Sequence, residues 1–144
     1  MITKKEYAKL VTKHSGKSPL LKDTLRAFFV GGFICTIGQV LRNFYSSLGL
    51  DKDAAGTAVS ITLIFIASML TATGLFDKIG KFSGAGTLVP ITGFSNAVTS
   101  PAMEFRSEGF VPGTASKIFE VAGPVIVYGT ASSVIAGLIY LFIK

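Results

Sequence analysis

The sequence has few charged residues, one cysteine, one histidine and no tryptophan. Charged residues make up 15% of the 144 positions, against about 25% in an average soluble domain, which disfavours an ordinary soluble fold. Cys35 is the single cysteine, so it excludes a disulfide within the chain, and we expect it to be a small packing residue. His14, the single histidine, has no second histidine or cysteine near it, so the sequence predicts no metal site.

The motifs of common enzyme classes are also missing. The sequence contains no HExxH, no Walker-type glycine loop followed by Lys and Ser or Thr, and no CxxC pair. Acidic side chains are absent from residues 25–47 and 57–75, which are strongly apolar. That absence argues against a small proton-coupled exporter, because such transporters need a titratable acid inside the membrane. We therefore expect neither an enzyme nor a cofactor.

Three long apolar runs are the dominant positive feature, at residues 25–47, 57–75 and 117–143. Each is about as long as a membrane crossing, which takes about 20 residues. The chain is 49% hydrophobic and has 16 glycines, a composition that suits helices packed closely inside a bilayer. We predict an all-α integral membrane protein with its membrane domain at residues 25–143.

Residues 84–103, GAGTLVPITGFSNAVTSPAM, have the length of a crossing but are interrupted throughout by Gly, Ser, Thr, Asn and Pro. Irregular backbone cannot face lipid, so it must be buried in protein or border water. We predict an extended stretch up to Pro90, then a helix that starts near Thr92 or Ser95 and runs to about Glu108. This discontinuous third element either crosses the membrane or dips in and returns. The fold therefore has three to four embedded helical segments.

Positive charge is concentrated at the N-terminus, within a net charge of +6. Residues 1–24 form a basic segment in which Tyr7, Leu10 and Val11 share one helical face. We expect this segment to be cytoplasmic and to rest on anionic lipid, with no nucleic-acid partner, because it directly precedes a membrane segment. Seven of the 14 basic residues lie at this end: Lys4, Lys5, Lys9, Lys13, Lys17, Lys22 and Arg26.

One face of the first run carries small residues at helical spacing. Gly31, Cys35 and Gly38 form a stripe that indicates close packing against another helix, and Arg42 continues the same stripe. Gln39 lies beside it. Arg42 has two interpretations that stand equally: it snorkels to the headgroups, or it contributes to an electropositive ring at the mouth of a pore.

The second and last runs carry similar patterns. Ser60 and Thr71 belong to a small polar stripe of the second run, where their hydroxyls can bond their own helix. In the last run Pro124 is expected to kink the helix. Three small residues predict a further packing stripe there: Gly129, Ser133 and Ala136.

Three motifs together resemble the SpoVAC/SpoVAEb family of sporulation membrane proteins in endospore-forming bacteria. They are VGGFICTIGQ (30–39), FSGAGTLVPITGFSNA (82–97) and AMEFRSEG (102–109), and the resemblance covers about residues 25–143. It implies a multi-pass protein of the inner membrane of the forespore and spore. The family is associated with moving dipicolinic acid, with calcium, into the developing spore and out at germination, and a mechanosensitive channel activity has been attributed to it.

The resemblance and the residues together predict a channel or permease subunit for dipicolinate, a small anion. The alternative is a non-conducting subunit that helps to assemble a larger membrane complex. A chain this small cannot enclose a pore, so we expect further copies or other subunits as partners. For any single candidate residue, we favour a role in packing over contact with the cargo. For the segment as a whole, we favour contact with the cargo. The pore-lining or substrate-contacting candidates are Gly84, Gly86, Thr87, Pro90, Thr92, Gly93, Ser95 and Asn96, with Gln39 and Arg42 from the first run.

Overall fold

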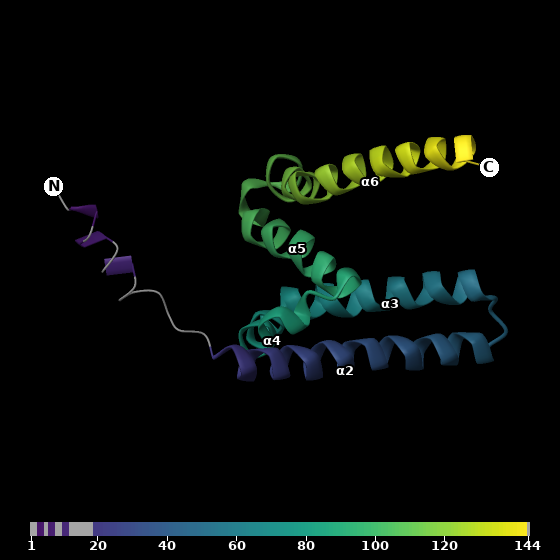
Figure 1. Cartoon of the computed structure of the whole chain (residues 1–144), viewed down its shortest axis with the longest axis horizontal. Coiled ribbons are helices and arrows are strands. Elements are labelled where there is room, and N and C mark those ends of the chain that lie inside the picture. Colours follow the sequence, from purple (N-terminus) through teal and green to yellow (C-terminus); the bar gives the residue numbers. More distant parts are fainter. Residues whose placement is uncertain (1–2, 5, 8–9, 12–18, 144) are drawn as a thin grey trace.

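The computed structural model describes residues 3–4, 6–7, 10–11 and 19–143 (Figure 1). His14 and Lys5, Lys9, Lys13 and Lys17 lie outside the described residues. Within the described part every regular element is helical, and three helices are long and apolar enough to cross a membrane: Leu20–Ser47, Lys52–Ala72 and Phe110–Ile143. The prediction of an all-α membrane protein is confirmed. The elements are α2 (Leu20–Ser47), α3 (Lys52–Ala72), α4 (Leu75–Ser83), the 3₁₀ turn η1 (Gly84–Thr87), α5 (Pro90–Glu104), the 3₁₀ turn η2 (Phe105–Glu108), the π-helical turn η3 (Phe110–Ala115) and α6 (Ser116–Ile143).

The first two helices form an antiparallel hairpin whose ends differ from the predicted spans. Helix α2 begins at Leu20 rather than at residue 25. Its N-cap is Pro19, and proline disfavours a helical conformation in the residue before it. Helix α3 covers 52–72 rather than 57–75, because the Asp51 side chain caps it by accepting a hydrogen bond of 2.9 Å from the Ala54 amide. It ends before Gly74, whose φ of +71° is the left-handed conformation that stops a helix.

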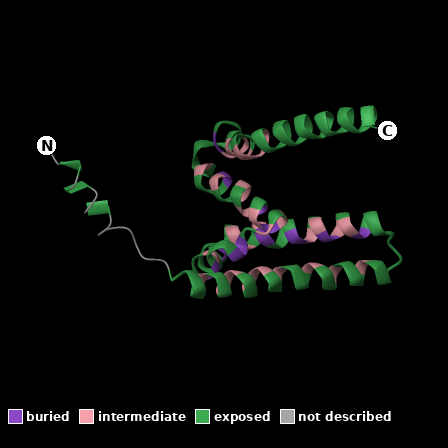
Figure 2. Ribbon diagram, viewed as in Figure 1, coloured by how far each residue is buried: buried purple, intermediate pink, exposed green. Residues whose placement is uncertain are grey.

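The buried core of the chain runs along one stripe of α3. Ala55, Val59, Leu63 and Ala67 recur every four residues and are all buried, and Figure 2 shows that burial is concentrated on α3 and on the elements around α4. Leu63 faces the small stripe of α2, since a Cβ added at Gly38 would lie 3.7 Å from the Leu63 Cδ1. Helix α2 has no buried residue of its own, so most of its surface is left for lipid or partners.

A short amphipathic helix, α4, follows α3 directly. Phe76 and Ser83 lie on the buried face of this helix. Lys81 is exposed, and its ammonium pairs with the Asp77 carboxylate at 2.7 Å. The helix ends at Gly84, where φ is +54°, and the chain turns back towards the hairpin through η1. Helix α4 therefore has the pattern of an element that lies at the membrane surface.

Residues 84–104, from η1 through α5, form what we call the re-entrant element. Helix α5 begins at Pro90, not at Thr92 or Ser95, because proline fits the first position of a helix, where no amide donor is needed. It ends at Glu104, and η2 continues only as a 3₁₀ turn to Glu108.

The contacts of α5 with α3 fix its direction. Pro90 and Ile91 line a hollow with Ser60 and Ile64, in the middle of α3. Further along, Asn96 bonds to Thr71 near the end of α3. Helix α5 therefore starts halfway along α3 and runs obliquely away from it, towards the end of the molecule where α4 lies (Figure 1). The third element thus turns back within the length of the hairpin, and three helices of the described chain are candidates for crossing a membrane.

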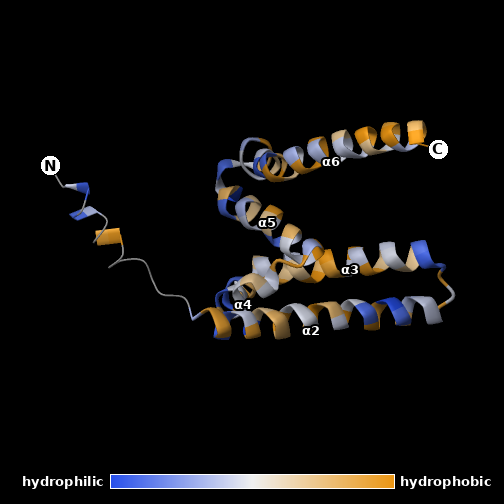
Figure 3. Cartoon of the chain, in the orientation of Figure 1, coloured by the Kyte–Doolittle hydropathy of each residue, from blue (hydrophilic) through white to orange (hydrophobic). Residues whose placement is uncertain are grey.

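Helix α6 leaves the rest of the chain after its first turns. Its start is held by η3, where a Cβ at Gly113 would collide with the Phe105 carbonyl, and by the Lys117 ammonium, which lies 4.5 Å from the centre of the Phe105 ring. From Pro124 to Ile143 every residue is exposed, and the end of the helix is strongly hydrophobic (Figures 2 and 3). The predicted packing stripe is wrong for a single chain, because nothing in the chain lies within 4 Å of a Cβ added at Gly129, and Ser133 bonds only the carbonyl of its own helix.

The side on which residues 105–109 emerge can be tested with single cysteines. In a Cys35→Ala background, Ser107→Cys should react with an impermeant thiol reagent from the same side as Lys22→Cys, since α5 returns to that side. Lys52→Cys, at the start of α3, should react from the opposite side. Labelling of Ser107→Cys together with Lys52→Cys would instead mean four crossings.

Candidate functional site at the re-entrant element

The re-entrant element meets α2 through a contact between two backbones. A Cβ added at Gly86 would lie 2.7 Å from the Ala27 carbonyl oxygen and 2.9 Å from its Cα, and one added at Gly31 would lie 3.3 Å from the Gly86 oxygen. Any side chain at Gly86 would therefore push η1 away from α2. Of the predicted packing stripe, Gly31 lies against this element, whereas Gly38 packs against α3.

The turn between η1 and α5 is closed by contacts within the element itself. A Cβ at Gly93 would lie 2.9 Å from the Thr87 carbonyl oxygen, so this helical position also requires glycine. The hydroxyl of Thr87 donates to the Gly84 carbonyl at 3.2 Å, and that of Thr92 to the Val89 carbonyl at 3.4 Å. Both threonines are buried. Their hydroxyls thus satisfy irregular backbone at membrane depth.

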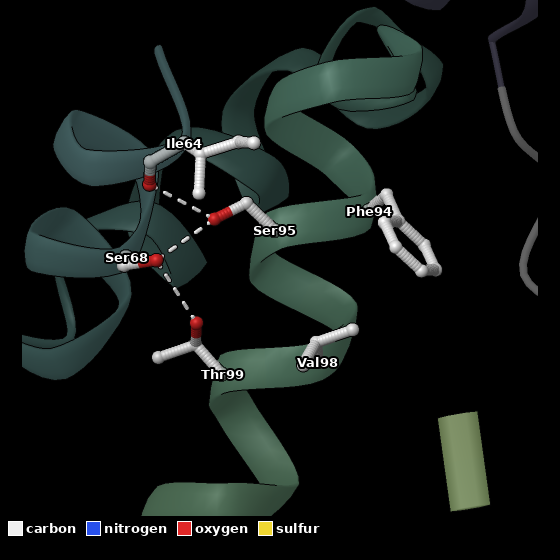
Figure 4. Close-up of a pocket in the computed structure, with 6 residues that line it drawn as sticks. All are labelled: Ile64, Ser68, Phe94, Ser95, Val98 and Thr99. Carbon is white, nitrogen blue, oxygen red and sulfur yellow. Dashed lines mark hydrogen bonds between the residues drawn. The ribbon is translucent and has the colours of Figure 1, made fainter. Parts of the chain in front are cut away.

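Hydroxyl groups join α5 to α3 in a cluster of Ser68, Ser95 and Thr99, which we call the Ser68 cluster (Figure 4). The Ser95 hydroxyl lies 2.9 Å from that of Ser68 and 3.0 Å from the Ile64 carbonyl oxygen. Thr99 donates to the Ser68 oxygen at 3.1 Å. Figure 4 shows Ser95 and Thr99 directed towards Ser68, whereas Phe94 points away from the cluster.

A second polar contact lies near the end of α3. The Thr71 hydroxyl has two acceptors within reach, the Ala67 carbonyl at 2.8 Å and the Asn96 Oδ1 at 2.9 Å. Thr71 therefore satisfies its own helix, as predicted, and also holds α5. Among the described residues, no buried side-chain nitrogen or oxygen lacks a hydrogen-bond partner.

Gln39 and Arg42 line a hollow of about 450 Å³, which we call the Arg42 hollow. Its walls come from α2, from Ser60 and its neighbours on α3, and from Val89 and Ile91 at the turn of the re-entrant element. Gln39 donates to Asn43 at 2.9 Å on its own helix. No hydrogen bond or ion pair to Arg42 is found within the described part of the chain, so its charge remains available to the hollow.

The structure divides the predicted site residues into groups. Gln39 and Arg42 are brought together in the Arg42 hollow, which Cys35 and Gly38 also line. Pro90 instead borders a hollow of about 520 Å³ that reaches Val125 of α6. The remaining candidates act in packing, turning or internal bonding: Gly84, Gly86, Thr87, Thr92, Gly93, Ser95 and Asn96.

Two residues of the Ser68 cluster were missed by the sequence analysis. Ser68 and Thr99 lie on helices where hydroxyls usually bond their own backbone, so neither carries a distinctive signal alone. The usable signal was spacing: Ser95 and Thr99 are four residues apart and share a helical face. Within the described residues, no three His, Cys, Asp or Glu side chains gather as metal ligands.

The contact between Gly86 and Ala27 predicts a large loss of stability on substitution. Gly86→Ala should lower the free energy of unfolding by about 1–3 kcal/mol, because the new methyl group meets backbone that cannot move aside. The measurement is unfolding of the purified protein in mixed micelles. Gly32→Ala, a helical glycine with open space around it, is the matched control and should be neutral or slightly stabilising. Equal effects of the two substitutions would contradict the tight contact.

The Ser68 cluster predicts energetic coupling between α3 and α5. A double-mutant cycle of Ser68→Ala and Ser95→Ala should give a coupling of about 0.6 kcal/mol, the average for hydrogen bonds between membrane helices. The same micelle unfolding assay measures it. Ser60→Ala combined with Ser95→Ala should show none, since Ser60 bonds only the Gly56 carbonyl of its own helix. Coupling of equal size in both cycles would refute a specific contact.

Comparison with known proteins accords with the motifs in this region. Residues 23–139 match the family described as SpoVAC/SpoVAEB sporulation membrane protein. The chain is similar to the stage V sporulation protein AC of Bacillus subtilis (strain 168), with 44% identity over 137 residues that cover 94% of this chain and 91% of the relative. No solved structure matches the chain. The chain therefore belongs to the SpoVAC/SpoVAEB family of sporulation membrane proteins.

Proposed function

We propose that this protein is a subunit of a passage that moves dipicolinic acid, with calcium, across the inner spore membrane during sporulation and germination. The observation that carries the proposal is the position of the re-entrant turn. Val89 and Ile91 lie at the middle of α3 and share one hollow with Arg42. In this proposal the turn and the arginine form the part of the passage that meets the cargo.

Physical chemistry supports a role for this turn beyond packing. Helix α3 has 21 residues and is therefore about 32 Å long, close to the thickness of the hydrocarbon core. Its middle, where Pro90 lies, corresponds to the bilayer centre. Non-helical backbone is tolerated at that depth only where protein buries it or water borders it. The glycine contacts bury one part of the turn in protein, and the largely apolar Arg42 hollow adds polar side chains from Gln39, Arg42 and Ser60.

The Arg42 hollow has suitable size and charge for a small anion. Its volume of about 450 Å³ lies within the range of about 300–1,000 Å³ typical of small-molecule sites. The Arg42 guanidinium is a planar fork that matches a carboxylate, and the Gln39 amide lies beside it. A single cationic side chain attracts dipicolinate without enclosing it, as conduction requires. This arrangement favours the mouth role of Arg42 over simple snorkelling.

Assembly with further subunits is part of the proposal. The three spans of one chain form no passage of their own, so conduction requires several copies or other subunits around a shared axis. Helix α6 is suited to such assembly, because it is exposed from Pro124 onwards and its small residues contact no helix of the same chain. We further propose that membrane tension opens the assembly, with bending at Pro90 and Pro124.

A cytoplasmic N-terminus is also proposed, on the basis of charge. In the described part, Lys22, Arg26, Lys78, Lys81 and Arg106 belong to segments at the end of the molecule where α4 is found, whereas Arg42 and Lys52 lie towards the other end. The positive-inside rule assigns the first end to the cytoplasm. The basic segment that precedes α2 would then meet the anionic lipid of that leaflet.

A second candidate function is a non-conducting assembly subunit. The specific observation in its favour is that the hydroxyls of Thr87, Thr92 and Ser95 bond inside the chain rather than facing a passage. In that case α6 and the exposed face of α2 would seat other subunits. The two functions differ in what Arg42 should do, because this residue has no packing role within the described chain.

Substitution of Arg42 separates the two functions. Arg42→Gln should lower dipicolinate accumulation in developing spores about tenfold or more, since a hydrogen bond to a charged group contributes about 1.5–3 kcal/mol. Dipicolinate is measured by terbium fluorescence, and the amount of subunit in the membrane complex is measured in parallel. Lys52→Gln, which removes a cation at the same end of the hairpin but outside the hollow, is the control and should leave accumulation unchanged.

Assembly of the complex decides the interpretation of this test. Loss of accumulation with the complex intact supports a passage lined by Arg42. Normal accumulation in Arg42→Gln, or a loss seen only when the complex fails to assemble, would reject the conducting role and favour the assembly subunit.

A further inference from the structure

A second hollow of about 380 Å³, which we call the apolar hollow, adjoins the Arg42 hollow through Ile34 and Leu63 but is not lined by Arg42. Its walls come from α2, α3, α4 and the turn. Ten of its twelve lining residues are Val, Ile, Leu, Phe or Ala, and the two others are Thr87 and Thr92. Both threonines direct their hydroxyls to backbone carbonyls, at Gly84 and Val89, so the hollow has no free polar group from them.

The position of the apolar hollow places its opening towards hydrocarbon. Phe33, Ile37 and Ile66 line it and remain exposed on the outer surface of the hairpin. All three lie well inside spans that are long and apolar enough to cross a membrane. The space is therefore continuous with the lipid around the protein rather than with water.

The chemistry of the lining selects the occupant. A cavity with apolar walls stays dry, because water needs polar partners. A gap without atoms would also deprive its lining of dispersion contacts. Its size falls within the range of sites that hold small molecules. The apolar molecule present in quantity at this depth is a lipid acyl chain.

The charge around α4 selects the headgroup. Phe76 and Ile79 of α4 line the hollow, so this helix lies where the hollow approaches the membrane surface. Lys78 and Lys81 lie on the same helix, and the Arg26 guanidinium lies 5.0 Å from the centre of the Phe82 ring. Against these three cations stand two carboxylates, Asp77 of α4, which pairs with Lys81, and Asp23, three residues before Arg26 on α2. This end of the hollow is complementary to an anionic headgroup.

We propose that an acyl chain of an anionic phospholipid occupies the apolar hollow, with its headgroup at α4. The chain would pack against Thr87 and Thr92 and so support the re-entrant turn. The lipid is thus a structural ligand of the turn, distinct from lipid that merely surrounds the helices. The inference does not depend on what the protein conducts.

The absence of tryptophan from the chain allows a direct test. Phe76→Trp places a single indole in the buried wall of the hollow, and Phe65→Trp places one on the exposed surface of α3. The full-length protein in detergent is titrated with phosphatidylglycerol brominated in its acyl chains, which quenches nearby indoles. We expect Phe76→Trp to lose most of its emission and to reach a plateau at a one-to-one ratio. Phe65→Trp should be quenched only in proportion to the brominated fraction of the micelle.

Competition and blocking complete the experiment. Unbrominated phosphatidylglycerol should restore the Phe76→Trp emission. Phosphatidylethanolamine should restore much less, because it lacks the net negative charge that the cations around α4 would bind. Adding Ala67→Phe, which fills the hollow from α3, should abolish the saturable quenching; the competition result stands alone if that variant does not fold. Proportional quenching at both positions would overturn the proposal. So would an indole at position 76 that stays unquenched, because the hollow would then be closed or filled by protein, including a helix from a second copy.

Discussion

The close approach of Gly86 to Ala27 is the contact on which the rest of this membrane domain depends. It holds η1 against the first part of α2, and the turn that follows reaches the middle of α3 at Pro90, where lipid would not tolerate irregular main chain. Gly31 supplies space from the side of α2, and Gly93 allows α5 to turn back tightly beneath Thr87. Gly86 and Gly93 are thus needed because a side chain at either position would collide with backbone atoms of Ala27 or Thr87. The turn can then line both the Arg42 hollow and the apolar hollow.

Hydrogen bonding completes what the glycines permit. Thr87 and Thr92 satisfy carbonyls of the turn, and the Ser68 cluster attaches the first half of α5 to α3. Together these bonds remove the cost of polar groups at membrane depth. They also explain why a segment so rich in hydroxyls need not be open to water along its whole length. The polar surface that remains is local, at Gln39 and Arg42.

Much of this arrangement could be predicted from the sequence, for identifiable reasons. Long apolar runs specify membrane helices almost regardless of context, so the three long apolar helices could be predicted, although the number of crossings was left at three or four. The interruption around Pro90 also identified the irregular element. Its direction was not predictable, because the choice between crossing and returning depends on which part of α3 meets Ser95 and Asn96. The cap at Asp51 could have corrected the start of α3, since an acidic residue just before an apolar helix is a local signal. The roles of Thr87 and Thr92 needed coordinates, because a hydroxyl in a sequence does not reveal which carbonyl it reaches.

The return of α5 to its starting side makes the cross-section of the chain unequal through the bilayer. Four helices pass through the layer near α4, namely α2, α3, α5 and α6, whereas α2, α3 and α6 alone continue to the opposite surface. The chain therefore has more helix in the half of the layer near α4 than in the other half. Stress that differs between the two leaflets, such as curvature, thus acts on such a chain with a sign as well as a magnitude.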